Sequence, residues 1–243
     1  MIKSYSICPQ AAGKYISSLY GTKKNIWIGT DEGIYIYAYA TETFTYFDLT
    51  TPNNVRITSI VNHILQDKDG NLWFSTNGQG LFRYNLSKNY LEQYEFTSAF
   101  GIVASTMADS DNQIWALTNQ GESGVYKLNK AENKFEPFGL LYNAGNHHSQ
   151  ALAMLEDSEQ TLWLGTWECG LQKIDKYTRQ TTTYLHPTDG KGVTHIHSLM
   201  EYAPHQLLIG SDDGLLLFNT LTEEYKLFTE NETVPNSLSN RFV

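Results

Sequence analysis

The sequence predicts an all-β fold, namely a β-propeller of four-stranded antiparallel blades with about five blades present. Three observations lead to this prediction. Related segments recur with a period close to 45 residues, each segment contains four short strand-like runs, and no stretch shows a convincing helical period. A repeat of this length that consists of short strands is typical of propellers.

The repeat is clearest around one central residue, which is tryptophan in four of its five copies. These anchors are Trp27, Trp73, Trp115, Trp163 and Leu208, with spacings of 46, 42, 48 and 45 residues. We interpret the tryptophan as the large flat side chain that packs one blade on the next. A threonine or serine follows three residues later and should bond local backbone, and a glycine after it should support a tight bend or a close backbone approach. The most repeated residues are therefore predicted to be structural.

The second repeat shows the predicted strands most plainly. Alternating runs cover 60–66, 72–76, 81–85 and 91–96, with turn residues between them. The same reading along the chain places blades at about 14–48, 56–97, 100–139, 148–186 and 193–229. Residues 2–7 read as the outer strand of a preceding blade, and 236–243 as the start of a following one. We therefore expect residues 1–243 to form a partial propeller that exposes two blade faces and self-associates through them. A five-bladed ring closed by other means is the alternative.

Composition excludes several classes of function. The chain has 243 residues, 17 basic and 26 acidic side chains and a net charge of −9, so no basic patch is available for nucleic acid. No apolar run approaches the roughly 18 residues of a membrane span, and residues 1–10 lack the pattern of a signal peptide. Cys8 and Cys169 match neither a disulfide framework nor a metal motif. Direct membrane contact of this segment and a cofactor are not expected.

The repeat phrase itself resembles a known family. In the second copy it comprises 57–60, 66–76 and 80–84, and in the fourth copy 155–157, 162–166 and 170–171. This phrase resembles the two-component regulator propeller repeat, and residues 236–240, Asn-Ser-Leu-Ser-Asn, are similar to its blade starts. The resemblance covers about residues 14–243. Two departures are Leu208 in place of tryptophan and a longer bend at 119–123, which should affect blade packing and the shape of the rim.

The resemblance implies a function that the residues alone do not give. Such repeats build the periplasmic sensor of hybrid two-component systems in Bacteroides-type bacteria, with two seven-bladed propellers, a β-sandwich, a membrane helix and a histidine kinase. It implies that this chain is a segment of a seven-bladed propeller and carries no kinase chemistry. The partners implied are an oligosaccharide, the neighbouring propeller and β-sandwich domains of the same polypeptide, and a second copy of the chain.

Loops on one rim of the predicted propeller are the candidate ligand site. Trp167 is the most prominent, because it occupies a bend where other repeats have Asp31, Asn77, Asn119 or Asp212, and an exposed indole can stack on a sugar. A loop anchor is the alternative reading. The candidate ligand-binding residues are Trp167, Glu168, His148, His195, His197, Asn77 and Arg56. The same rim also carries Asp31, Glu32, Gln79, Asn119, Glu122, His147, Asp212 and Asp213.

Two other patterns are weaker signals. His195 and His197 can point to one face, and His147 and His148 could add ligands, but nothing in the sequence requires a metal and none is predicted. Paired acids recur at Asp67/Asp69, Asp109/Asp111 and Asp157/Glu159. They could indicate glycoside hydrolysis, yet their place between the first and second strands favours turn formation.

Three functional hypotheses follow. The first is a sensor segment that binds a carbohydrate or a partner domain without chemistry. The second is a propeller enzyme, a lyase of the streptogramin type or a glycoside hydrolase, for which Asp212, Asp213, Glu168, His195 and His197 form the credible group. The third is a scaffold whose rims contact other domains.

Overall fold

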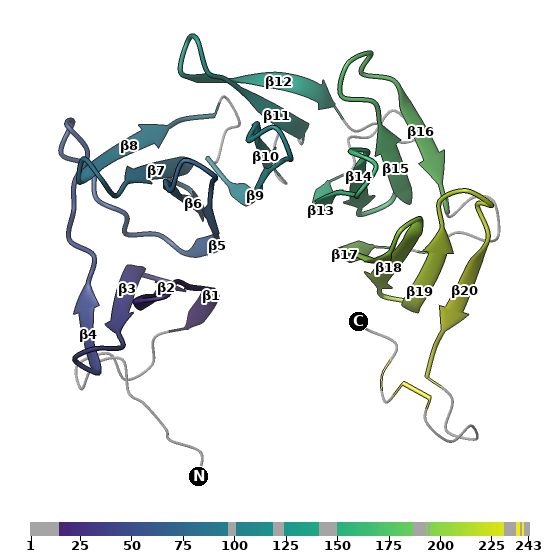
Figure 1. Ribbon diagram of the computed structural model, residues 1–243, viewed down its shortest axis with the longest axis horizontal. Helices are drawn as coiled ribbons and strands as arrows, with labels where there is room; N and C mark the ends of the chain where they lie inside the picture. The colour runs from purple at the N-terminus through teal and green to yellow at the C-terminus, as the bar shows by residue number, and fades with distance from the viewer. Residues whose placement is uncertain are drawn as a thin grey trace. The chain divides into compact units, whose positions relative to one another are not determined.

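The computed structural model describes residues 15–96, 101–118, 124–140, 150–186, 193, 195–230, 237, 238 and 240. Within these residues the chain forms five four-stranded sheets and no helix (Figure 1). Neighbouring strands run antiparallel in each sheet, so the predicted all-β class with four-stranded antiparallel units is confirmed. No described helix has the length and hydropathy needed to cross a bilayer.

The strands follow one another in chain order across each sheet. The first sheet contains β1 (Ile16–Gly21), β2 (Asn25–Thr30), β3 (Gly33–Ala38) and β4 (Thr43–Tyr46). The second contains β5 (Val61–Gln66), β6 (Leu72–Thr76), β7 (Leu81–Asn85) and β8 (Tyr90–Tyr94). The third contains β9 (Val103–Ala108), β10 (Ile114–Thr118), β11 (Gly124–Asn129) and β12 (Lys134–Leu140). The fourth contains β13 (Ala151–Glu156), β14 (Leu162–Thr166), β15 (Leu171–Ile174) and β16 (Thr181–Tyr184), and the fifth β17 (Ile196–Ala203), β18 (Gln206–Ser211), β19 (Gly214–Asn219) and β20 (Tyr225–Phe228).

The predicted strands of the second repeat agree with the structure to within two residues at each end. The predicted outer strand at 2–7 lies outside the described residues. The predicted trailing start at 236–243 is described at three positions, where Leu238 makes a parallel bridge with Glu230.

The chain divides into two compact units, residues 1–108 and 109–243, and each unit has a core between consecutive sheets. In the first unit, Trp27 of the first sheet packs on Val61 and Phe74 of the second. In the second unit, Trp163 of the fourth sheet packs on Ile196 and Phe218 of the fifth. We call the face that a sheet turns to the following sheet its trailing face, and the opposite face its leading face. The anchor tryptophans therefore lie on trailing faces, as their packing role requires.

The bend between the second and third strands is built as the sequence predicts. In the second sheet, the Thr76 hydroxyl donates to the carbonyl of Gly80 at 2.6 Å. Gly80 has a φ of +77°, and a Cβ there would lie 2.3 Å from the Tyr94 carbonyl oxygen. Glycine is thus needed both for the left-handed conformation and for the close approach of the fourth strand.

The recurring acids lock the turn between the first and second strands. Asp67 accepts a hydrogen bond from the Asn71 backbone N–H at 2.8 Å, which confirms the turn reading. The structure adds a second bond, because the other carboxylate oxygen accepts the indole N–H of the tryptophan six residues later. The three pairs are Trp73 to Asp67 at 2.7 Å, Trp115 to Asp109 at 2.9 Å and Trp163 to Asp157 at 2.7 Å. Each of these carboxylates therefore fixes its own anchor tryptophan.

In the second unit two glutamates each tie a turn serine to the following sheet. Glu201 accepts the backbone N–H and the hydroxyl of Ser158, at 2.8 and 2.6 Å. Glu156 accepts the same two groups of Ser110 and also the ammonium of Lys176, at 2.5 Å from Nζ. The turn serines are thus contact points between consecutive sheets.

Candidate functional site

Trp167 lies in the bend after β14, directly after the buried Thr166. Its backbone N–H donates to the Gln150 carbonyl at 2.9 Å, which fixes the bend, while 39% of the residue remains exposed. An exposed tryptophan has a large apolar surface and one N–H donor to offer a ligand.

His195 lies directly before β17 and reaches back to this bend. Its ring stacks on the Trp167 indole with centroids 3.7 Å apart and planes at 23°. Its backbone N–H donates to the Trp167 carbonyl at 3.2 Å, and its φ is +48°. A non-glycine residue in the left-handed region carries some backbone strain, which persists where the surroundings hold it. The stack therefore joins the fourth and fifth sheets at this bend.

Asp212 connects both histidines. It lies in the bend after β18, at the position that corresponds to Trp167 in the fourth sheet, since Thr166 and Ser211 precede them. One carboxylate oxygen lies 2.5 Å from His195 Nδ1, and the other lies 2.5 Å from His197 Nε2. We call Trp167, His195, His197 and Asp212 the rim cluster.

The charge of Asp212 sets the hydrogen-bonding character of the rim cluster. Burial raises the pKa of Asp212, but the hydrogen bonds from His195 and His197 lower it by more, so its pKa lies below the usual value. The ionised carboxylate only accepts, so His195 Nδ1 and His197 Nε2 carry the hydrogens. The opposite ring nitrogens have no hydrogen-bond partner among the described residues. They accept from a hydroxyl when the ring is neutral and donate when it is protonated.

These groups together suit a ligand with apolar C–H surface and hydroxyl groups, because the indole covers the former and the imidazoles bond the latter. Asp212 already bonds one ring nitrogen of each histidine. Within the described residues no group of three or more His, Cys, Asp or Glu side chains is arranged to hold a metal ion. His147 and His148, which could have added ligands, lie outside the described residues.

The other predicted site residues are dispersed. Glu168 is exposed in the same bend as Trp167. Asn77 and Arg56 belong to the first unit, where Asn77 is exposed and bridges to Ile102, and Arg56 forms an ion pair with Asp48 at 2.7 Å. The structure therefore groups three of the ranked residues and adds Asp212, which the sequence analysis names as a rim residue and joins to His195 and His197 only in the enzyme hypothesis. Its signal was its position, directly after the repeated Ser or Thr.

Several remaining rim residues have structural roles. The Gln79 side chain accepts from the backbone N–H groups of Thr58 and Ser59 and donates to the Arg56 carbonyl. Both its amide oxygen and its amide nitrogen are therefore already hydrogen-bonded within the protein. Asp31 accepts the backbone N–H of Tyr15. Asn119 and Glu122 lie outside the described residues.

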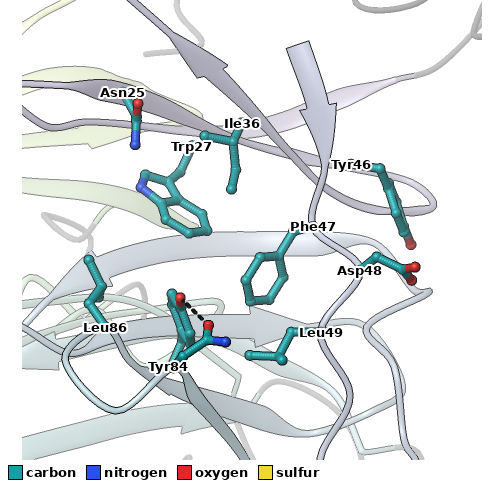
Figure 2. A pocket seen from close by; sticks show the side chains of 10 residues that line it. Asn25, Trp27, Ile36, Tyr46, Phe47, Asp48, Leu49, Tyr84 and Leu86 are labelled. Carbon is teal, nitrogen blue, oxygen red and sulfur yellow. Dashed lines mark hydrogen bonds between the residues drawn. The ribbon is translucent and has the colours of Figure 1, made fainter.

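A second candidate site is a pocket in the first unit, of about 450 Å³. Figure 2 shows aromatic side chains on its wall with amides and a carboxylate around them. The lining residues are Asn25, Trp27, Ile36, Tyr46, Phe47, Asp48, Leu49, Tyr84, Leu86 and Asn89.

In the next three sheets a long basic side chain, Arg83, Lys127 or Lys173, lies over the anchor tryptophan. Trp27 pairs with Ile36 instead, so its ring lacks this cover.

Trp27 also lacks the carboxylate that the next three tryptophans have. Tyr20 pairs with Trp27 as Leu65 pairs with Trp73, so Thr22 holds the position of Asp67. The Thr22 hydroxyl already accepts the Asn25 backbone N–H at 2.9 Å, and the Trp27 indole N–H donates to no described residue.

We expect Thr22→Asp to stabilise the first unit by about 1 kcal/mol, because a carboxylate can accept from Asn25 and from Trp27 together. Urea denaturation followed by circular dichroism would measure the change. Thr22→Asn is the matched control, since it replaces the second carboxylate oxygen with an NH2 group, which cannot accept a hydrogen bond. An equal gain in both variants would contradict the proposed Asp–Trp bond.

Comparison with known proteins shows what this chain resembles. The two component regulator propeller model matches residues 54–78. Histidine kinase P4 of Formosa agariphila is 26% identical over an alignment of 229 residues, which covers 89% of this chain and 16% of that protein. The chain carries the two-component regulator propeller repeat, as its sequence predicts.

Two solved structures show the fold. The extracellular domain of BT4673, a putative hybrid two component system of B. thetaiotaomicron, matches with a TM-score of 0.77 and 22% identity, over 94% of this chain and 29% of that one. Virginiamycin B lyase of Staphylococcus aureus matches with a TM-score of 0.67 and 16% identity, over 88% of this chain and 69% of the lyase. The sheets are β-propeller blades, and the chain spans under a third of the sensor proteins that it matches.

Proposed function

We propose that this chain is a ligand-sensing propeller segment of a hybrid two-component sensor, that it lies outside the cytoplasm, and that its ligand is an oligosaccharide. The propeller repeat at 54–78 and the likeness to a sensor's extracellular domain support the sensor role. In this role the chain binds without chemistry, and a longer polypeptide supplies the kinase.

The observation that carries the ligand proposal is the rim cluster. An exposed indole lies beside two imidazoles whose outer nitrogens are uncommitted among the described residues. Sugars present the matching chemistry, with C–H faces for stacking and hydroxyls for hydrogen bonding. Because the cluster draws on both the fourth and the fifth sheet, a bound ligand would favour one arrangement of the two, which is what a sensor requires.

We expect one class in a panel of plant, fungal and host oligosaccharides to raise the melting temperature in a saturable way. Trp167→Ala should weaken its calorimetric affinity at least tenfold, because the stacking surface is removed. Tyr177→Ala is the matched control, since Tyr177 is an 82% exposed aromatic outside the rim cluster. Unchanged affinity in Trp167→Ala would contradict the assigned site.

A lyase is the second candidate, and one specific observation favours it. The virginiamycin B lyase structures share the fold, and one of them is a catalytically inactive histidine variant, H270A in that protein's own numbering, with quinupristin. A histidine oriented by a carboxylate, as His195 is by Asp212, has the form of a general base. Turnover of quinupristin that is lost in His195→Ala would support the lyase and contradict a purely sensory role.

A further inference from the structure

The first sheet keeps two hydrogen-bond donors whose acceptor is missing from its sequence. In the second sheet, one Asp67 oxygen accepts the Asn71 backbone N–H at 2.8 Å. The other oxygen accepts the Asn71 side-chain amide at 2.9 Å and the Trp73 indole N–H at 2.7 Å. Asn25 and Trp27 hold the same two positions in the first sheet, so the donors are retained there.

Thr22 replaces only half of the missing carboxylate. Its hydroxyl accepts the Asn25 backbone N–H at 2.9 Å, as the first oxygen of Asp67 does for Asn71. Neither the Asn25 amide nor the Trp27 indole N–H has a hydrogen-bond partner in the part of the chain that the structure describes. The place of the second carboxylate oxygen is therefore left to an acceptor from outside these residues.

The Asn25 amide is uncommitted on its other side as well. In the second sheet, the Asn71 amide oxygen accepts from the Asn85 amide at 2.9 Å. By strand register the partner of Asn25 is Ala38, whose side chain forms no hydrogen bond. Trp27 is only 4% exposed, and a buried donor without an acceptor costs free energy. A ligand oxygen at this place would remove that cost.

The pocket of about 450 Å³ begins at these two donors. Asn25 and Trp27 both line it, and they are two residues apart on β2, so their side chains lie on one face of the sheet. Figure 2 shows the indole nitrogen on the side of the Trp27 ring nearer Asn25 and away from Phe47. Phe47, Tyr84 and Leu86 make much of the remaining wall apolar. The volume is in the range of small-molecule sites.

The charges around this pocket favour an anion. The turn between the first and second strands carries two acids in each of the next three repeats, whereas the first repeat has Lys23 and Lys24 there, both exposed. Exposed ammonium groups attract anionic ligands. The carboxylate of the lining, Asp48, lies on the opposite side of the view from Asn25 in Figure 2 and forms an ion pair with Arg56 at 2.7 Å.

We propose that this pocket binds a small organic acid whose carboxylate is joined to an aromatic or aliphatic group. One carboxylate oxygen accepts from the Trp27 indole and the Asn25 amide, as the second oxygen of Asp67 accepts from their equivalents. The apolar group lies along Phe47 and Tyr84. A carboxylate is preferred to a neutral amide or hydroxyl because charge-assisted hydrogen bonds are stronger. The site lies within the first unit and does not depend on the rim cluster.

The indole signals in nuclear magnetic resonance spectra of the ¹⁵N-labelled chain test this assignment directly. The chain has five tryptophans, and Trp27→Phe identifies the signal of Trp27. Titration with phenylacetate should shift this signal in a saturable way. The signals of Trp73, Trp115 and Trp163 should stay in place, because their N–H groups already donate to aspartates. Phenylacetamide has the same shape without the charge and should bind at least tenfold more weakly.

Thr22→Asp is the decisive variant, because its own carboxylate occupies the two donors. It should stay folded and bind phenylacetate at least tenfold more weakly than wild type. Thr41→Asp is the matched control, since it adds the same charge at an exposed position in the turn between β3 and β4, and its affinity should stay within about threefold of wild type. Asn25→Ala removes one donor and should weaken binding about fivefold.

Three results would overturn the proposal. The first is the lack of a saturable shift of the Trp27 signal with phenylacetate, benzoate and 3-phenylpropionate. The second is wild-type affinity in both Thr22→Asp and Asn25→Ala, which would show that these donors do not hold the ligand. The third is equal affinity for phenylacetate and phenylacetamide, which would show that the pocket binds the apolar group and not the acid.

Discussion

Trp163→Ala should lower the free energy of unfolding of the second unit by about 3–5 kcal/mol. Trp163 is 1% exposed and packs against Tyr184 and Phe218, with ring centroids 5.8 and 6.0 Å away. Its removal leaves a cavity between the fourth and fifth sheets and deprives the buried Asp157 carboxylate of its indole donor. Urea denaturation followed by far-ultraviolet circular dichroism would measure the loss.

Leu208→Ala is the matched control, because Leu208 holds the equivalent position on the fifth sheet. Leu208 is half-buried whereas Trp163 is fully buried, so we expect a loss of about 1 kcal/mol or less. Trp163→Phe separates packing from hydrogen bonding, and should cost about 1–3 kcal/mol, since the ring remains and the donor is lost. Equal losses for Trp163→Ala and Leu208→Ala would show that the sheets do not pack as described.

Glu156→Ala should lower the free energy of unfolding of the same unit by about 3 kcal/mol. Glu156 accepts from Ser110 and holds the ammonium of Lys176, whose side chain is only 6% exposed. Burial lowers the pKa of Lys176, but the Glu156 hydrogen bond and the charges of Asp109, Glu156 and Asp111 raise it by more, so its net pKa is raised. Without Glu156 the lysine remains buried with weaker compensation, from Asp109 at 3.7 Å and Asp111 at 3.9 Å.

A raised pKa in the folded state fixes the pH dependence of this loss. The stabilisation by Lys176 is fully present below the lysine pKa of the unfolded chain, about 10.4, and is lost as pH rises through the higher folded value. The gap between wild type and Glu156→Ala should therefore be complete at pH 7 and shrink only above about pH 10. Glu201→Ala is the control, because Glu201 bonds Ser158 as Glu156 bonds Ser110 but has no lysine partner among the described residues. We expect it to cost about 1 kcal/mol, and a cost as large as that of Glu156→Ala would contradict the role of Lys176.

The fold could be predicted from sequence because its signals are local. In the second sheet, alternation and turn residues predict strands at 72–76 and 81–85, and the structure has the same bounds. The outer strand is shifted, since it was expected at 91–96 and runs from Tyr90 to Tyr94. Outer strands alternate less strictly because one of their edges is unpaired, so their ends are less well specified.

The rim cluster could be predicted only in part, because it depends on contacts between distant segments. The His195–Asp212 contact links two strands of one sheet, and the Trp167–His195 stack links two sheets. The sequence indicates that all three residues lie in rim loops, but ring stacking and a shared carboxylate depend on side-chain orientation in the assembled blades. The pocket at Trp27 escaped prediction for a different reason, since Ile36 lines it at the position where the next three repeats have a long basic side chain over the tryptophan.

The bond between each turn aspartate and its tryptophan also bears on how the blades form. It joins residues six apart, so closing this loop costs little chain entropy, and the hairpin can form before any neighbouring sheet is in place. The second, third and fourth repeats therefore each carry a local bond that closes their own hairpin. The first repeat, with Thr22, and the fifth, with Leu208, have no such bond because each lacks one of its two partners. A repeat that encodes its own hairpin closure can be duplicated as a unit, which gives a physical reason why this motif recurs in tandem.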